Sequence, residues 1–272
     1  MNYFKNLNYK SYLEKYPFHK LLNIDLKKYG KIDKKVVRSI YETVDPSNKT
    51  PFSTELDDLV RLHYLVTSRK VTTILEFGIG CSTPVFDHAL LENKKKYAKY
   101  VNNNLRRSNP FECHSIDNNK KWISYTKKQY PFTKNTTFHF SDCHVTTFNS
   151  KMCTMYDKLP NICPDLIYLD APDQFSPKGS IRGLSLRHSD RLPMAADILT
   201  LEHFLLPGTL IVVDGRTANA RFLKCNLQRN WNHYHSITHD AHYFELKETP
   251  LGIFNRKQIE FSLGKDWLKR LK

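Results

Sequence analysis

The feature that most constrains the fold is a regular alternation between short apolar runs and segments with helical spacing. The apolar runs predict strands and lie at 71–77, 111–117, 136–140, 165–170 and 209–214. The segments with helical spacing lie at 83–91, 120–130, 194–205 and 218–230. This order predicts a doubly wound α/β fold, in which a mostly parallel sheet carries helices on both faces.

The part of the chain before this alternation reads as a helical extension. Residues 1–70 are polar and aromatic, and apolar spacing over 53–66 predicts a helix with Ser53 or Thr54 as its N-cap. We therefore expect a helical N-terminal extension over 1–70 and one ligand-binding α/β domain over 71–272.

Three later segments depart from the alternation. Residues 235–246 and 252–263 follow each other without a clear helix between them, which predicts an antiparallel strand pair at one edge of the sheet. Residues 93–109 carry clustered lysines, arginines and asparagines. We interpret them as a solvated basic loop with room for a helix in its first half; an anion-contacting flap is the functional alternative.

The composition limits the partners and the location that we expect for the protein. The chain has 42 Lys+Arg against 27 Asp+Glu, a net charge of +15 that favours anionic partners, but the lysines are spread along its length. Nucleic acid is therefore the less favoured partner. The 6 cysteines form no Cys-x-x-Cys pair, which predicts free thiols in a reducing compartment. No stretch reaches the roughly 18 apolar residues that span a bilayer, so we expect a cytoplasmic protein. The sequence is compatible with a homo-oligomer.

The strongest local motif is the segment 74–83. Its strand ends near Glu76, a turn with Gly78 and Gly80 follows, and a helix begins at once. Glycine lets the backbone approach a ligand, and a helix N-terminus offers unpaired N–H groups. Thr83 replaces the third glycine of a pyrophosphate fingerprint, and Glu76 would repel a phosphate. A phosphate-free cofactor with a cationic end fits better, and S-adenosylmethionine has an ammonium, a sulfonium and no phosphate.

This segment resembles the first motif of the class I S-adenosylmethionine-dependent methyltransferases, a Rossmann-like family. The resemblance extends over about 70–263, since 165–172 and 206–214 are similar to later motifs of the family. It implies that Asp117 binds the ribose hydroxyls and that Asp142 contacts the adenine amino group. The cofactor-binding candidates are Glu76, Gly78, Gly80, Ser82, Thr83, Asp117, Asp142 and Cys143.

Two aspartates are the main candidates for catalysis. Asp170 and Asp214 end neighbouring predicted strands, so they could supply a general base or together bind a divalent cation such as Mg²⁺. The order is similar to that of metal-dependent O-methyltransferases, except that Gly215 stands where they often carry Asn; Asn219 could supply the missing ligand. His188 is a third candidate, as a base in the following loop.

Arginines surround this edge of the predicted sheet. Such a density suggests a site for an anionic acceptor, because guanidinium binds phosphate or carboxylate in a bidentate manner. A solvated loop with surface ion pairs is the structural alternative. The substrate-binding candidates are Arg182, Arg187, Arg191, Arg216 and Arg221.

The sequence thus predicts an S-adenosylmethionine-dependent methyltransferase that O-methylates an anionic or sugar-like small molecule, such as a glycan precursor or a phosphorylated metabolite. An RNA or DNA methyltransferase is one alternative, although the segment Asp170-Ala-Pro-Asp lacks the Asn-Pro-Pro-Tyr pattern of many base methylases. A non-catalytic binding protein on the same fold is the other.

Overall fold

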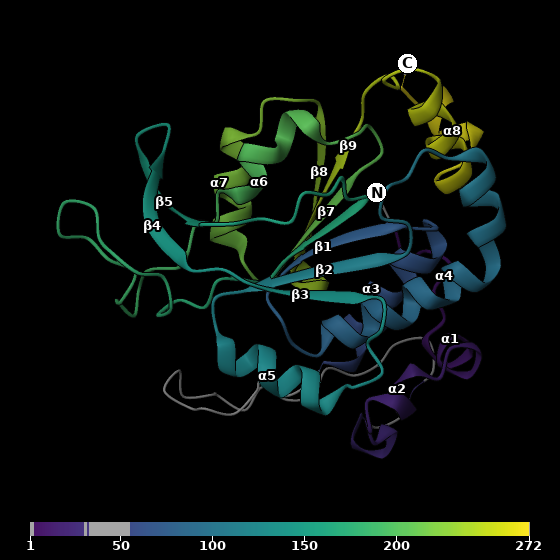
Figure 1. The fold of residues 1–272 in the computed structure, drawn as a ribbon, viewed down its shortest axis with the longest axis horizontal. Helices are drawn as coiled ribbons and strands as arrows, with labels where there is room; N and C mark the ends of the chain where they lie inside the picture. Colours follow the sequence, from purple (N-terminus) through teal and green to yellow (C-terminus); the bar gives the residue numbers. More distant parts are fainter. Residues whose placement is uncertain (1–2, 30–31, 33–54, 272) are drawn as a thin grey trace.

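The computed structural model describes residues 3–29, 32 and 55–271. Its centre is a seven-stranded sheet with the order β3-β2-β1-β6-β7-β9-β8 (Figure 1). Five strands are parallel, and they are β1 (Thr73–Phe77), β2 (Glu112–Asp117), β3 (Thr136–Phe140), β6 (Leu166–Leu169) and β7 (Leu210–Asp214). The antiparallel edge consists of β8 (Trp231–Ser236) and β9 (Ala241–Leu246).

The helices form layers on both faces of this sheet (Figure 1). One layer contains α3 (Leu56–Ser68), α4 (Ser82–Asn104) and α5 (Lys120–Gln129). The opposite layer contains α6 (Asp197–Leu201), the 3-10 turn η2 (Glu202–Phe204) and α7 (Thr217–Asn226). The remaining helical elements are α1 (Tyr9–Lys15), α2 (Phe18–Leu21), η1 (Leu26–Tyr29), η3 (Ile237–His239), α8 (Ile253–Ser262) and α9 (Lys265–Lys269).

The predicted doubly wound, Rossmann-like α/β fold is confirmed. The parallel strands run outward from β1 in two directions, toward β2 and β3 on one side and toward β6 and β7 on the other. The chain therefore reverses its direction of winding between β1 and β6. In open sheets of this type, ligands bind outside the carboxyl ends of the strands at such a switch point.

Strand β1 shows how the sequence produces two cores. Leu75 and Phe77 are fully buried in the cluster that includes α6 and α7, whereas Ile74 is fully buried in the cluster that includes α3 and α4. Successive side chains of a strand point to opposite faces, and covering both faces explains the nearly continuous apolar run. Each such side chain stabilises the fold by about 1.5–3 kcal/mol.

The prediction for the C-terminal strand pair was right in kind and wrong in position. The antiparallel pair is β8 and β9, joined through η3, so 235–246 spans two strands and not one. Residues 252–263, predicted as a strand, form α8, because Asn255 and Ile259 are buried one helical turn apart and pack at the amino edge of the sheet.

Two further differences concern the middle of the chain. The interpretation of 93–109 as a solvated basic loop with a helix in its first half is right in part: α4 continues further than expected, through Asn104, with its lysines exposed, and irregular chain follows from Leu105. A hairpin that was not predicted, β4 (Cys143–Phe148) and β5 (Lys151–Tyr156), extends beyond the sheet. The proposed N-caps Ser53 and Thr54 lie outside the described residues; α3 begins after Glu55.

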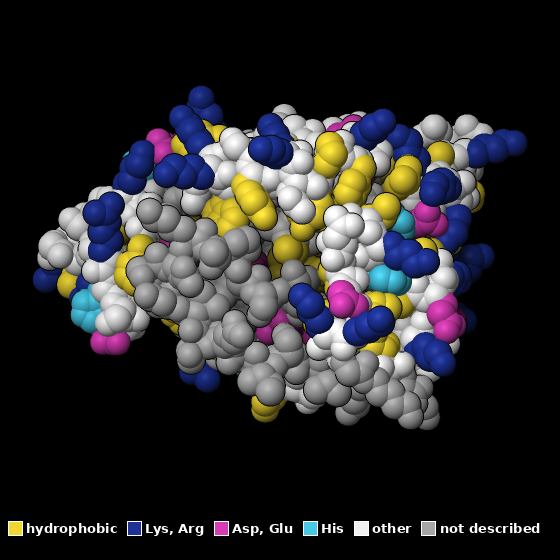
Figure 2. Space-filling model, turned by 90° about the horizontal axis from the view of Figure 1, so that it is seen from below, with side chains coloured by type: hydrophobic (Ala, Val, Ile, Leu, Met, Phe, Trp, Pro, Cys, Tyr) yellow, Lys and Arg dark blue, Asp and Glu magenta, His cyan; other side chains and the backbone are white. Residues whose placement is uncertain are grey.

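The surface bears on the expected partners. Figure 2 shows lysine and arginine side chains distributed around one face and not gathered in a single patch. All six cysteines are free thiols, as predicted. Within the described ranges, no helix is both long and apolar enough to cross a bilayer.

Candidate functional site

The turn after β1 lies at the switch point of the sheet. Gly78 has a φ of +103°, and a Cβ added there would lie 3.0 Å from the backbone oxygen of Asp170. Only glycine allows this conformation and this close approach without strain. A Cβ built on Gly80 meets nothing within 4 Å, so the outer side of the turn is open. The turn therefore joins β1 closely to β6 and leaves space for a ligand above Gly80.

The carboxylate of Glu76 holds this turn from inside. It is fully buried and accepts hydrogen bonds from the hydroxyls of Ser82 at 2.5 Å, Thr83 at 2.8 Å and Ser115 at 2.5 Å. Burial raises the pKa of Glu76 to about 7, against the opposing effect of these donors. Its contacts fix the first turn of α4 against β1 and β2, so Glu76 shapes the turn from below.

Asp117, at the end of β2, supports the same turn from the other side. One carboxylate oxygen accepts from the backbone N–H of Ile79 at 3.0 Å, and the other accepts from the N–H of Asn119 at 2.7 Å. Burial raises its pKa, and the backbone hydrogen bonds oppose that shift. Asp117 is thus oriented at the rim of the turn, as expected for a residue that also accepts hydrogen bonds from a ligand.

The two catalytic candidates have different partners. Asp170 is half exposed, and Arg216 donates to its carboxylate at 3.2 Å and to its backbone oxygen at 2.8 Å. Asp214 instead accepts a 2.7 Å hydrogen bond from the hydroxyl of Tyr168. Burial and the charge of Asp170 raise the pKa of Asp214 to about 7.

These contacts do not fit a divalent cation between the two aspartates. The guanidinium of Arg216 already supplies the positive charge beside Asp170. Asn219, the suggested replacement ligand, is buried, and its side-chain amide bonds the backbone N–H and oxygen of Ala195 at 3.0 and 3.2 Å. Hard cations need several oxygen ligands, which this arrangement does not offer.

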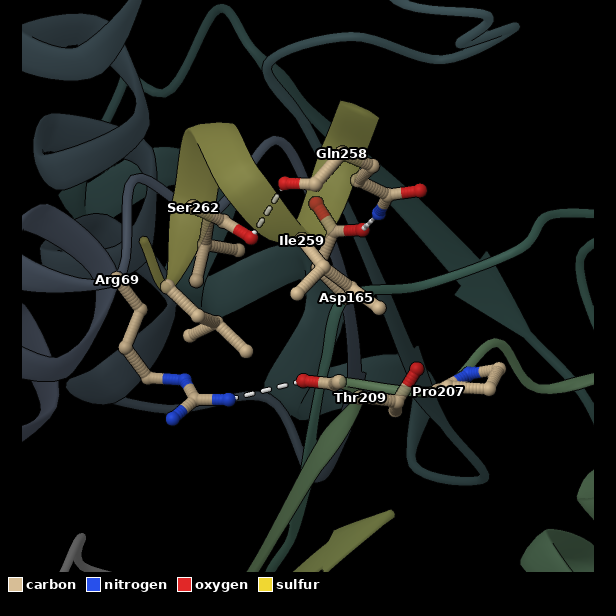
Figure 3. Close-up of a pocket in the computed structure, with 10 residues that line it drawn as sticks. Arg69, Asp165, Pro207, Thr209, Gln258, Ile259 and Ser262 are labelled. Carbon is tan, nitrogen blue, oxygen red and sulfur yellow. Dashed lines mark hydrogen bonds between the residues drawn. The ribbon is translucent and has the colours of Figure 1, made fainter. Parts of the chain in front are cut away.

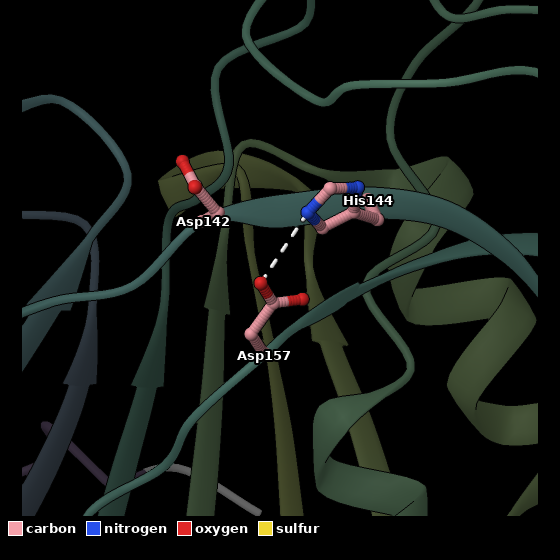
Figure 4. Close-up of side chains that lie close together, drawn as sticks. All are labelled: Asp142, His144 and Asp157. Carbon is pink, nitrogen blue, oxygen red and sulfur yellow. Dashed lines mark ion pairs between the residues drawn. The ribbon is translucent and has the colours of Figure 1, made fainter.

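Asp142 and Cys143 lie where the chain enters the hairpin. Asp142, His144 and Asp157 converge there, with potential ligand atoms all within 4.8 Å of one another (Figure 4). Lys178 pairs with Asp142 at 2.7 Å, and His144 lies 3.3 Å from Asp157. This cluster is accounted for as a surface ion-pair network. The thiol of Cys143 is buried in the main core, away from the surface of the edge.

The first part of the loop after Asp170 is held by residues that follow β2 and β7. Arg216 donates to the backbone oxygen of Pro172 at 2.9 Å, and Ser176 exchanges hydrogen bonds with Asn118. Arg191 donates to the backbone oxygen of Ser185 at 2.9 Å. Three other candidates of this loop are exposed and are not brought to Asp170 by any contact in the described part of the chain: Arg182, Arg187 and His188. Arg221 is exposed on α7.

Sequence reasoning missed Tyr156, at the end of β5. Its side chain is buried, and its ring centroid lies 5.9 Å from that of Phe77 under the glycine turn. Burial and the nearby charge of Asp117 raise its pKa. Its hydroxyl has no hydrogen-bond partner among the described residues. No sequence signal pointed to it, because the hairpin that carries it was not predicted.

A second hollow lies at the opposite, amino edge of the sheet. It is lined by residues of α8 and by Arg69 and Asp165, which lie around a space of only about 10 Å³ (Figure 3). That is about the room needed by one water molecule. This edge is therefore closed, and the carboxyl edge is the candidate site.

Comparisons with known proteins give only distant similarity. No family model matches the sequence, and a search of curated proteins finds no match. The fold is similar to SAH-bound methyltransferase PaMTH1 of Podospora anserina, at 12% identity over 75% of this chain and 85% of that chain, with a TM-score of 0.39. It is also similar to the O-methyltransferase TomG of Streptomyces achromogenes in complex with SAM, at 11% identity over 71% and 81% of the two chains, with a TM-score of 0.37.

Proposed function

We propose that this protein is an S-adenosylmethionine-dependent methyltransferase whose cofactor binds at the carboxyl edge between β1 and β6. One observation carries the proposal. The Gly78 turn is pressed against β6 and braced by Asp117, and its outer side at Gly80 is open. Backbone shaped in this way can lie directly against a flat nucleoside.

The charge of this edge supports a cationic cofactor without phosphate. Carboxylates lie at or next to the carboxyl ends of adjacent strands, although the chain as a whole carries +15. These carboxylates are Glu76, Asp117, Asp170 and Asp214. The pKa values of Glu76 and Asp214 are raised to about 7 and Arg216 pairs with Asp170, so the net negative charge of this edge is small, but its carboxylate oxygens still favour an ammonium over a pyrophosphate. The unpartnered hydroxyl of Tyr156 offers a further polar contact under the turn.

The residues of the chain have separate roles in this proposal. The bound cofactor would supply an electrophilic methyl group on its sulfonium. The turn and Asp117 would orient it, which lowers the entropic part of the barrier. Asp170 would accept the proton of an acceptor hydroxyl, and Arg216 would position Asp170 by its two contacts. The reaction would thus be O-methylation without a metal bridge between the aspartates.

The acceptor is proposed to be an anionic small molecule that enters under the loop 171–195. The arginines of this loop would attract it from solution. In the same proposal, 71–272 is the catalytic domain and 1–70 an extension. In the described part of that extension, α3 packs on α4 and adds Leu62, Leu65 and Val66 to the core on one face of the sheet.

Calorimetric titration with S-adenosylmethionine tests the proposal. We expect saturable binding to the wild type and none to Gly78→Arg, whose side chain would have to occupy the turn. Gly183→Arg is the control, because Gly183 also has a positive φ but lies in the exposed loop with open space around it. No binding to the wild type would refute the proposal. If the wild type binds the cofactor, methyl transfer to cell extracts, with and without magnesium, tests the activity.

A further inference from the structure

A cavity of about 290 Å³ lies between the hairpin, the long loop and the first turn of α7. Most of its wall is apolar. The apolar side chains are Met152 and Cys153 of β5, Leu186, Leu192 and Met194 of the loop, and Ala218 of α7. The other two lining residues are Asp190 and Arg191.

The cavity lies close to the proposed transfer site. Ala218 is four residues after Asp214, so their Cα atoms are at most about 14 Å apart. The first turn of α7 is fixed to the end of the loop by Asn219, which bonds both polar backbone atoms of Ala195. The same loop begins directly after Asp170. Arg216, which contacts Asp170, is two residues before Ala218, so the cavity lies next to the segment that carries Arg216.

The wall selects the kind of molecule. The pocket opens to solvent on one side, and its volume of about 290 Å³ gives room for a small ring or a branched chain. The apolar wall disfavours a sugar, because each hydroxyl that is turned against these side chains would lack a partner, at a cost of about 1–3 kcal/mol. The two methionines offer flexible, polarizable surface that adapts to an apolar body.

Arg191 adds one charged contact to this wall. One of its guanidinium nitrogens donates to the backbone oxygen of Ser185 at 2.9 Å, which holds the group in place. The other nitrogens have no partner among the described residues. Asp190 does not cancel this charge at the wall, since its side chain is 85% exposed and lies 3.9 Å from His188. A carboxylate on the ligand would complete the hydrogen bonds of Arg191.

We infer that this cavity binds the body of the methyl acceptor, and that the acceptor is a compact, largely apolar molecule with one carboxylate. That this molecule is the methyl acceptor rests on the proposed function. That the cavity binds a ligand of this class rests on the residues that line it. The inference narrows the proposed anionic acceptor to apolar carboxylates and excludes sugars. It also assigns ligand recognition to Arg191 among the loop arginines.

Methionine methyl groups allow a direct test by NMR. The chain has 4 methionines, of which Met152 and Met194 line the cavity and Met155 does not. Protein labelled with ¹³C at the methionine methyls would be titrated with benzoate, benzamide and glucuronate. We expect benzoate to shift Met152 and Met194 but not Met155, benzamide to bind about tenfold more weakly, and glucuronate to leave all three unchanged.

Two variants with matched controls locate the binding. Arg191→Gln should raise the Kd for benzoate about tenfold, whereas Arg256→Gln, an exposed arginine of α8, should not change it. Ala218→Leu should fill the cavity and abolish the benzoate shifts. Cys225→Leu, at an exposed position of the same helix, should preserve them. Leucine is a good helix former, so both helix variants should fold.

The outcomes separate this inference from the proposed function. Glucuronate binding as tightly as benzoate, or equal losses in the two arginine variants, would overturn the ligand class. Absence of methionine shifts with every probe would overturn the cavity as a binding site, even if calorimetry shows cofactor binding. If benzoate shifts the methionine signals of the wild type but not those of Ala218→Leu, the cavity is a binding site even if S-adenosylmethionine does not bind. In that case only the claim that the ligand is a methyl acceptor would be refuted.

Discussion

Strand β6 has an aspartate at each end, and the two aspartates have opposite surroundings. Asp165, at the amino end, pairs with Arg107 at 2.9 Å and accepts further hydrogen bonds from Thr72, Thr73 and Gln258. Its side chain is 14% exposed. Asp170, at the carboxyl end, is 51% exposed and pairs with Arg216 at 3.2 Å.

The difference separates an edge whose carboxylate is used internally from one whose carboxylate is half exposed. At the amino edge α8 covers the strands, and every oxygen of Asp165 is used internally. At the carboxyl edge the corresponding carboxylate keeps an exposed side. The same strand thus places one carboxylate where it stabilises the fold and the other where it can meet a ligand.

The largest expected effect comes from exchanging each aspartate for asparagine. Asp165→Asn should lower the free energy of unfolding by about 3 kcal/mol, because it leaves the buried guanidinium of Arg107 without its countercharge. Asp170→Asn should lower it by less than about 1 kcal/mol, because the pair with Arg216 is partly solvated. Urea unfolding of both variants measures this. Methyl transfer should fall about 100-fold in Asp170→Asn alone. Equal destabilisation by Asp165→Asn and Asp170→Asn would contradict the proposed difference between the two aspartates.

A second effect of similar size concerns pH. The pKa of Glu76 is raised from 4.5 to about 7 in the folded chain, so the folded state holds this proton more tightly than the unfolded state. The free energy of unfolding should therefore fall as pH rises from 4.5 to 7, by at most about 3 kcal/mol from this group. Glu76→Gln should remove that part of the slope. Urea unfolding at pH 5 and pH 8 compares the two proteins, and parallel slopes would contradict the buried setting of Glu76.

A smaller effect separates two glycines with the same backbone requirement. Gly78 and Gly252 both have a positive φ, but only at Gly78 would a Cβ meet neighbouring atoms. Gly252→Ala, at the amino end of α8, should cost about 1 kcal/mol of stability and leave cofactor affinity unchanged. Gly78→Ala should cost about 2 kcal/mol and weaken S-adenosylmethionine binding at least tenfold. Thermal unfolding and calorimetry measure both. Unchanged affinity in Gly78→Ala would place the cofactor elsewhere.

The sequence predicted the elements of the carboxyl edge better than those of the amino edge. Short-range patterns fix where β1, β2, β6 and β7 end, so the acidic and glycine residues at those ends were found. α8 was mistaken for a strand, since its apolar residues read as alternating. In the structure Asn255 and Ile259 are buried one helical turn apart, and Ile259 lies beside Gly208, a residue distant in sequence that local patterns do not reveal.

The hairpin β4–β5 could not be predicted for a local reason. Its turn consists of Asn149 and Ser150, both with positive φ. Tight hairpin turns of this kind usually contain glycine, which is the signal that sequence reasoning looks for. Tyr156 was missed for the same reason, and so was the cavity against Met152. The sequence therefore did not predict the part of the candidate site that the hairpin forms. It did predict the glycine turn and the strand ends.

The smallest expected effect comes from this hairpin and tests whether it belongs to the candidate site. The hydroxyl of Tyr156 is buried without a partner in the described chain, so Tyr156→Phe should leave stability unchanged or raise it by up to about 1 kcal/mol. If the cofactor supplies the missing partner, the variant should bind S-adenosylmethionine several-fold more weakly, as measured by calorimetry. The ring packing on Phe77 is retained, so the comparison isolates the hydroxyl. A loss of stability with unchanged affinity would show that the hydroxyl has an internal partner, such as a buried water. Tyr156 would then stabilise the fold and have no role in cofactor binding.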